Sequence, residues 1–105
     1  MEEKTVYYVY VLRCRDNSLY TGIATDWQRR FTEHLEKRGA KYTKSHPVER
    51  IERVWQAADK IAACKLEYRI KALEKLQKET LITDKTTLDA LLGDKLDSTR
   101  YTVIV

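Results

Sequence analysis

The chain has 105 residues, enough for one modest hydrophobic core and consistent with a single domain. Charged residues make up 34% of it and its apolar content is ordinary, which excludes extensive disorder. No apolar run approaches the roughly 20 residues of a membrane span, and the polar start MEEKT lacks the apolar core of a secretion signal. We therefore expect a cytoplasmic protein that has no contact with a membrane.

The net charge of +4 is unevenly distributed along the chain. Residues 29–78 contain fourteen Lys or Arg against seven Asp or Glu. The flanks are weakly acidic, with three basic and four acidic residues in 1–28 and three and five in 79–105. A basic central region favours an anionic partner, nucleic acid first, although solubilising surface charge gives the same balance.

The first elements predict a β-hairpin. Residues 6–14 (VYYVYVLRC) are β-branched and aromatic almost throughout, which predicts a strand covered on both faces. RDNS supplies side chains that suit a turn, and LYTGI (residues 19–23) returns as the second strand.

A helix follows the hairpin. Thr25 and Gln28 have the spacing of a capping box, and Gly39 after a basic pair predicts the C-terminal cap. The residues at every fourth position predict the buried stripe of this helix: Trp27, Phe31 and Leu35.

Residues 39–47 (GAKYTKSHP) predict a basic loop, and residues 50–57 a third strand. Asp59 predicts the start of a second helix, and residues 74–82 continue it or form a short helix after a bend. The tail predicts a short helix at 88–92 and a terminal strand at 101–105. The core stripe of the second helix consists of Ala62, Leu66, Ile70 and Leu73.

This order predicts an α/β (α+β) fold in which helices flank a small antiparallel three-stranded sheet. We expect a domain over residues 1–82, with residues 83–105 as an extension that packs on it or trails from it. Cys14 and Cys64 match no zinc spacing and are expected to be small core residues.

Four residues outside the core pattern could carry chemistry. Gly22 inside a strand marks a bulge or a close approach, either of another element or of a ligand. Arg30 and His34 lie one turn apart at the edge of the first helix's stripe, where they could point into a cleft or remain at the rim. Glu67 has a comparable edge position on the second helix, but it could equally form an i,i+4 pair with Lys71.

The loop region adds cations interleaved with the aromatic Tyr42. Such a segment can bind phosphates and stack on bases, or it can be a solvated loop. Its candidate substrate-binding residues are Lys37, Arg38, Lys41 and Lys44.

Together these side chains suit phosphodiester cleavage. A carboxylate binds Mg²⁺ or a similar cation, which polarises a phosphate. An arginine stabilises the charge of the transition state, and a tyrosine or histidine orients or deprotonates water.

In this order the residues resemble the GIY-YIG nuclease superfamily, and more closely its small single-domain bacterial members. The family's two short motifs lie on a hairpin, and YVY (residues 8–10) and YTG (residues 20–22) occupy their places here. Arg30 lies ten residues after Tyr20, where the family has an arginine, and His34 falls where several members have histidine or tyrosine. The resemblance covers about residues 5–82.

The segment CKLEYRIKAL is similar to the stretch around the family's metal-binding glutamate, which makes Glu67 the match. The resemblance therefore implies a metal-dependent endonuclease that acts on DNA rather than RNA, branched or damaged DNA included, with Mg²⁺ or Mn²⁺ on Glu67. It implies that Tyr20 or Tyr10 activates the water, Arg30 binds the phosphate and His34 assists. Gly22 would leave room for the DNA backbone.

Two departures from the family pattern stand out. Tyr8 replaces the first glycine of the GIY motif and shares a strand face with Tyr10, so we expect it to crowd the cleft. Thr21 replaces the isoleucine of YIG. The family's further polar group on the last helix falls near Lys78 and Glu79. The alternative function is a non-catalytic nucleic-acid-binding module with this fold, and a protein partner that supplies targeting is left open.

Overall fold

The computed structural model describes residues 5–84 and 87–105. This part of the chain contains four strands and five α-helices, with one 3₁₀ turn before the last strand. In chain order they are β1 (Tyr7–Cys14), β2 (Leu19–Ala24), α1 (Trp27–Leu35), α2 (Lys41–Ser45), β3 (Val48–Ala57), α3 (Lys60–Ala72), α4 (Lys75–Thr83), α5 (Thr87–Leu92), the 3₁₀ turn Ser98–Arg100 and β4 (Tyr101–Val103).

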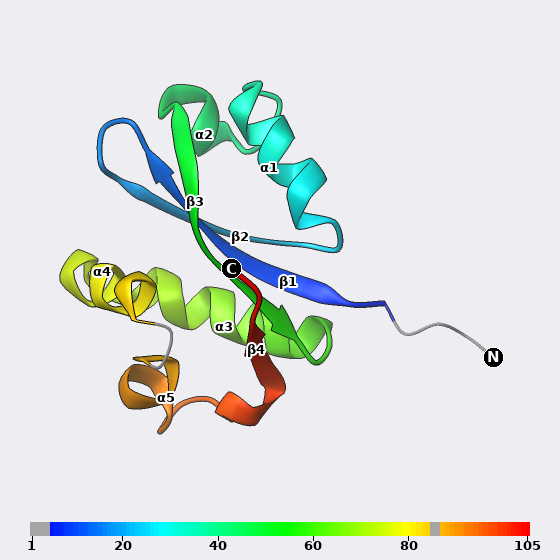
Figure 1. The fold of residues 1–105 in the computed structure, drawn as a ribbon, viewed down its shortest axis with the longest axis vertical. Helices are drawn as coiled ribbons and strands as arrows, with labels where there is room; N and C mark the ends of the chain where they lie inside the picture. The colour runs from blue at the N-terminus through cyan, green and yellow to red at the C-terminus, as the bar shows by residue number, and fades with distance from the viewer. Residues whose placement is uncertain (1–4, 85–86) are drawn as a thin grey trace.

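The fold is a layered α+β arrangement, as predicted (Figure 1). Helices α1 and α2 cover one face of the antiparallel sheet, and α3, α4 and α5 lie on the other. The sheet has four strands in the order β2-β1-β3-β4, so the prediction of three strands was wrong. The fourth strand comes from the tail, where Tyr101–Val103 pairs with Trp55–Ala57 on β3. None of the described helices is long and apolar enough to cross a membrane.

The strand register assigns the hairpin side chains to the two faces. Tyr10 pairs with Gly22 and Leu12 with Tyr20, so these four residues point to the α1 side. The alternate residues of β1, such as Val9, face α3 and join the larger core cluster. Because β2 is an edge strand, Tyr20 lies at the border between the two helical layers.

Helix α1 differs from the prediction at its start and on its buried face. Asp26, not Thr25, is the N-cap, and its carboxylate accepts a hydrogen bond from the Arg29 amide at 3.0 Å. His34 is fully buried, whereas Leu35 is 45% exposed. The helix therefore turns its Arg30–His34 edge toward Tyr10, and the expected apolar stripe is only half-buried.

The predicted basic loop after α1 contains the short helix α2. Lys37 has the left-handed backbone conformation (φ 60°) that was expected of a capping glycine. Gly39 serves packing instead, since a Cβ there would lie 2.4 Å from Nδ1 of His34. The segment thus folds back over α1, which buries Thr43.

The opposite layer matches the predicted pattern. Asp59 caps α3, accepting from the Ala62 amide at 2.8 Å, and Ala62, Leu66 and Ile70 are buried. The tail packs on this layer, and its buried leucines belong to the main core cluster: Leu88, Leu92 and Leu96. Cys14 is buried as expected, but Cys64 is exposed because it lies on the outer face of α3.

A buried arginine joins this layer to the sheet. The Arg13 guanidinium donates to both carboxylate oxygens of Glu79 on α4, at 2.6 and 2.5 Å, and to Glu52 on β3 at 2.9 Å. Only 8% of the Arg13 side chain is exposed. The hydrogen bonds from Arg13 lower the pKa of Glu79. The same interaction is the main reason why the pKa of Arg13 is raised.

We predict that Arg13→Met lowers the free energy of unfolding by about 3 kcal/mol, because it removes one partner of a largely buried ion cluster. The measurement is urea denaturation at neutral pH. Arg50→Met is the matched control, since Arg50 also pairs with Glu52 but is 56% exposed, and it should cost under about 1 kcal/mol. Equal losses in the two variants would contradict the special role of Arg13.

Candidate active site

Tyr10 lies at the centre of the site, and its ring fits directly over Gly22. A Cβ at Gly22 would lie 2.5 Å from the Tyr10 hydroxyl and 2.7 Å from the adjacent ring carbon. The close approach predicted at this glycine is therefore made by a side chain of the same protein. Contact between Gly22 and a substrate stays a prediction.

A hydrogen-bonded chain runs from Tyr10 to the backbone of the α1–α2 connection. The Tyr10 hydroxyl lies 2.9 Å from Nε2 of His34, and Nδ1 of His34 lies 2.7 Å from the hydroxyl of Thr43. Thr43 in turn donates to the carbonyl oxygen of Ala40 at 3.0 Å. All three side chains are almost completely buried.

The hydrogen bonds between Tyr10, His34 and Thr43 determine which atom carries each proton. A hydroxyl has one proton to donate, and Thr43 uses it on Ala40, so Nδ1–H of His34 donates to Thr43. Burial, reinforced by the charge of Arg30, lowers the pKa of His34 to about 4, so the ring is neutral at pH 7. Its Nε2 is then an acceptor, and Tyr10 donates its proton to it.

The surroundings keep that proton on Tyr10. Burial and the neighbouring Tyr20 raise the pKa of Tyr10 to about 12. A hydrogen bond from Arg30 acts in the opposite direction, and the charge of Glu67 raises the pKa further. The electrostatic influence of Tyr20, Arg30 and Glu67 thus converges on one hydroxyl, although these residues come from three different elements.

We expect the neutrality of His34 to make stability depend on pH. In the unfolded chain a histidine binds a proton below about pH 6.5, whereas in the folded protein His34 stays neutral down to about pH 4. Lowering the pH through this window therefore favours unfolding, by up to about 1.4 kcal/mol per pH unit.

The measurement is urea denaturation between pH 7 and pH 5, above the range in which carboxylates titrate, with imidazole NMR signals as a direct readout. His34→Gln should remove most of the dependence. A His34 signal that titrates near pH 6.5 in the folded protein would contradict the prediction.

Tyr20 lies next to this chain on the exposed side. Its ring centroid is 5.1 Å from that of His34 and 5.9 Å from that of Tyr42, with which it is stacked. Tyr42 stacks on His46 at 3.9 Å, which extends the row of rings toward the surface. Tyr20 is half-buried, unlike Tyr10, and is therefore the tyrosine that a substrate can reach.

A cavity of about 380 Å³ lies around the edge strand at Tyr20. Tyr42 lines it from the α2 side, and Lys71 and Lys78 line it from α3 and α4. Tyr8 is not among its lining residues; it pairs with Ala24, at the other end of β2. The crowding that we expected from Tyr8 is therefore not found at this cavity.

Glu67 is the metal ligand that the family resemblance predicts. Its carboxylate lies 3.3 Å from the ammonium of Lys71, so the alternative i,i+4 pair is present, and Lys71 lines the cavity beside Tyr20. The Glu67 side chain is 24% exposed. Among the described residues no group of three or more His, Cys, Asp or Glu side chains could hold a metal ion. A single carboxylate fits Mg²⁺ or Mn²⁺, because such ions commonly take their other ligands from waters and substrate phosphate.

Arg30 lies on α1 and lines a different cavity, of about 400 Å³, beside Ile23 and Ala24 at the other end of β2, so it is not a lining residue of the cavity at Tyr20. Its guanidinium pairs with Glu33 at 3.0 Å, and 35% of the side chain is exposed. The hydrogen bond with Glu33 raises the pKa of Arg30, and the interaction with Tyr10 adds to this. The residue is thus charged, held near Tyr10 and still open to solvent.

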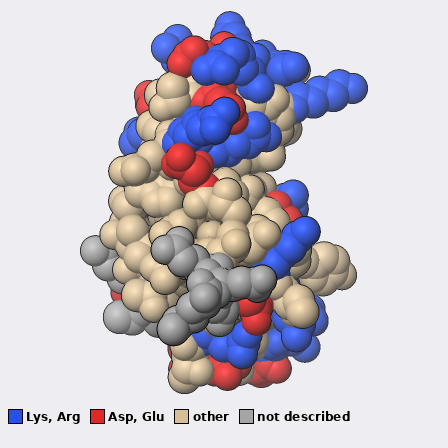
Figure 2. Space-filling view, turned by 90° about the vertical axis from the view of Figure 1, so that its right-hand side faces the viewer, with Lys and Arg blue, Asp and Glu red and all other residues tan. Residues whose placement is uncertain are grey.

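The predicted phosphate-binding residues are all exposed, but the structure does not bring them into the cavity. Lys37 and Arg38 follow α1, and Arg38 pairs with Glu36 at 3.0 Å. Lys41 and Lys44 lie on the exposed side of α2. Figure 2 shows Lys and Arg gathered over the end of the molecule where α1 lies, above a largely uncharged band.

Sequence reasoning missed Thr43, Lys71 and Lys78 as parts of this site. Thr43 was hidden inside a segment taken for a loop, and nothing in its neighbours marks it as buried. The lysines could have been found, because Lys71 follows Glu67 by one helical turn. Lys78 lies where the family's further polar group was expected, whereas its neighbour Glu79 is bound to Arg13.

The fold and the site together define a GIY-YIG domain. Residues 6–83 match the family described as the GIY-YIG catalytic domain, so this chain belongs to that family, a superfamily of nucleases that generally depend on a divalent metal.

Relatives at the level of whole chains are UPF0213 proteins. The chain is 52% identical over 77 residues to UPF0213 protein FN1575 of Fusobacterium nucleatum, covering 73% of this chain and 77% of that protein. It is 42% identical over 89 residues to UPF0213 protein YhbQ of Salmonella typhimurium, covering 85% and 89%. Among solved structures it resembles the UPF0213 protein BH0048 of Bacillus halodurans, with 40% identity, a TM-score of 0.50 and coverage of 74% of this chain and 83% of that one.

Proposed function

We propose that this protein is a metal-dependent endonuclease that hydrolyses phosphodiester bonds in DNA, with branched or damaged DNA as its target. The proposal is supported by the cavity at Tyr20, which Tyr42, Lys71 and Lys78 line from three helices, and by Glu67, whose carboxylate pairs at 3.3 Å with Lys71 of that lining. We also propose that it acts in the cytoplasm, with a protein partner for targeting left open.

The proposed roles follow from the exposure of each side chain and from the hydrogen-bonded chain that begins at Tyr10. Tyr20 orients or deprotonates the attacking water, because its ring borders the cavity. Arg30 binds the scissile phosphate and stabilises the negative charge of its transition state. Tyr10, whose hydroxyl proton is donated in a hydrogen bond to His34, is a positioning residue that packs beside the ring of Tyr20. Lys71 and Lys78 bind phosphates that enter the cavity.

Glu67 would hold the Mg²⁺ or Mn²⁺ ion, which polarises the phosphate and stabilises the leaving oxygen. Lys71, now paired with Glu67, would be released toward the substrate when the carboxylate binds the ion. The outer basic residues Lys37, Arg38, Lys41 and Lys44 would contact DNA further from the cleaved bond. Their exposure supports this role.

The test is an incubation with supercoiled plasmid and with branched, nicked and blunt duplexes, with Mg²⁺, with Mn²⁺ and with chelator. We expect metal-dependent cleavage that Arg30→Ala reduces by at least about a hundredfold. Arg29→Ala is the matched control on the same helix, since Arg29 is 78% exposed and pairs only loosely with Glu33 at 3.8 Å. Binding with a steep salt dependence but without cleavage in either metal would favour the non-catalytic module.

A further inference from the structure

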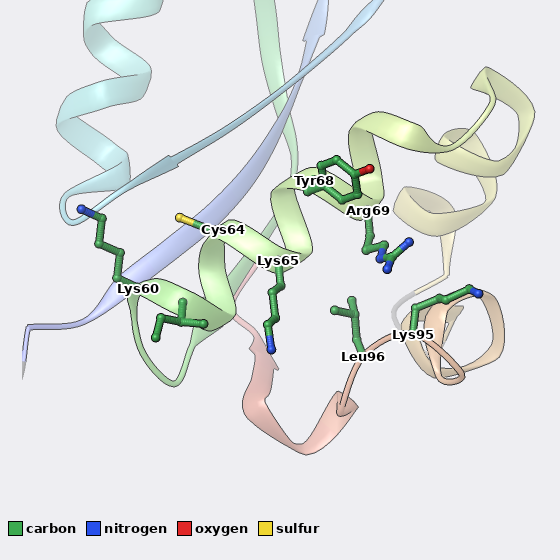
Figure 3. A pocket seen from close by; sticks show the side chains of 8 residues that line it. Lys60, Cys64, Lys65, Tyr68, Arg69, Lys95 and Leu96 are labelled. Carbon is green, nitrogen blue, oxygen red and sulfur yellow. The ribbon is translucent and has the colours of Figure 1, made fainter.

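The outer side of α3 borders a groove of about 600 Å³, which we call the α3 groove. One wall is α3 itself, and the other is the segment after α5 that carries Lys95 and Leu96. Figure 3 shows Lys65 and Arg69 pointing from α3 toward this segment, while Cys64 and Tyr68 lie along the opposite edge of the helix. The groove shares no lining residue with the cavity at Tyr20.

The groove is positively charged. Lys60, Lys65 and Arg69 line it from α3, and Lys95 lines it from the facing segment. Of the described residues that line it, none is a carboxylate. Lys95 pairs with Asp94 at 4.0 Å, and Lys65 and Arg69 point toward the segment that carries Lys95, so among the described residues the cations that meet there outnumber the carboxylates and favour an anionic occupant.

Tyr68 shows what kind of anion fits. Its side chain is 66% exposed, so it contributes little to the core, and the Arg69 guanidinium lies 5.5 Å from its ring centroid. An open aromatic ring beside a cation is the combination on which nucleic-acid bases stack while their phosphates are neutralised. Ile61, which is 68% exposed, adds apolar surface of the kind that base faces contact.

The position of Tyr68 connects the groove to the candidate active site. Tyr68 follows Glu67 directly, so on a helix the two side chains lie about 100° apart. A DNA strand that leaves Glu67 can therefore pass over Tyr68 and enter the space between Arg69 and Lys95. In a duplex the base faces are covered by stacking, so only an unpaired strand can offer them to this ring.

We propose that the α3 groove binds a single-stranded arm of DNA that extends from the cleavage site. This rests on the proposed nuclease function, and it narrows the substrate to DNA with an unpaired arm next to the junction. The groove then contributes to the selection of the DNA target.

The test measures binding by fluorescence anisotropy in chelator, so that no cleavage occurs. The probes are a labelled single-stranded 12-mer and the matching blunt duplex. Tyr68→Ala should weaken single-strand binding about tenfold and change duplex binding less than twofold, whereas Tyr68→Phe, which keeps the ring, should bind like the parent protein. The double variant K65Q/R69Q should reduce the salt slope for the single strand by about 1.4.

Three outcomes would overturn the proposal: unchanged single-strand binding in Tyr68→Ala, equal losses for single strand and duplex, or equal losses in Tyr68→Ala and Tyr68→Phe. Arg15→Glu is a charge-changing control at the far end of β1. Because binding is measured without metal, the result does not depend on cleavage, and the proposal for the α3 groove can be contradicted separately from the proposed nuclease function. Conversely, Tyr68→Ala could cleave duplex DNA normally and still bind the single strand as well as the parent protein does. That result would refute the proposal for the α3 groove and leave the proposed nuclease function intact.

Discussion

Replacement of Glu67 by glutamine is expected to abolish metal-dependent cleavage, with a loss of at least about a thousandfold. The substitution keeps the size of the side chain but removes the charge that would hold a divalent ion. Metal coordination supplies several kcal/mol of transition-state stabilisation, and each 1.36 kcal/mol corresponds to about tenfold in rate. The measurement is single-turnover cleavage of a branched duplex over a series of Mg²⁺ and Mn²⁺ concentrations.

Glu49→Gln is the matched control, because Glu49 is an exposed carboxylate on β3 that pairs with Arg50. It should cleave like the parent protein. Both variants should unfold at similar urea concentrations, since the Glu67–Lys71 pair is partly exposed and worth only a few tenths of a kcal/mol. Full activity of Glu67→Gln at any metal concentration would rule out the proposed metal site.

The two tyrosines of the hairpin are expected to respond differently to loss of their hydroxyl groups. Tyr20→Phe should lower the cleavage rate by about 10² to 10⁴, the usual range for a lost general base or orienting group, with little effect on stability. Tyr10→Phe should lower the rate less than about tenfold, because its proton is committed to His34 and its ring remains in place. It should instead destabilise the fold by about 1–3 kcal/mol, since Nε2 of His34 is left buried without a donor.

Cleavage rates and urea denaturation of the same preparations separate the two effects. The variants are matched, because both replace a hairpin tyrosine on the same sheet face. A large rate loss in Tyr10→Phe without loss of stability would assign the catalytic role to Tyr10. Equal rate losses in both variants would show that the hydrogen-bonded chain through His34 takes part in the reaction.

Much of the fold could be predicted because its strongest signals are local. The run of β-branched and aromatic residues in the hairpin, the cap at Asp59 and the stripe Ala62, Leu66 and Ile70 each depend on a few neighbouring residues. The errors lie where a distant partner decides the outcome. His34 replaced Leu35 as the buried residue of α1 because Tyr10 and Thr43 satisfy its ring nitrogens, and helical periodicity contains no record of such partners.

The candidate site shows the same division. Tyr20, Arg30 and Glu67 could be named in advance because a family resemblance fixed their spacing. The different roles proposed for Tyr10 and Tyr20 could not be predicted, because the burial of Tyr10 and the partial exposure of Tyr20 depend on β2 being an edge strand. Lys71 and Lys78 reach the cavity around that edge from α3 and α4, although they follow Tyr20 in the sequence by more than fifty residues.

The contribution of the tail has a practical consequence for work on the isolated domain. The family match ends at residue 83, yet α5 and the following segment supply three core leucines, and β4 covers one side of β3. A fragment trimmed to the matched residues would carry a bare strand edge and an uncovered apolar layer, which are the features that drive aggregation. Expression and crystallisation trials should therefore retain the whole chain, because the residues that match the family leave out part of the hydrophobic core.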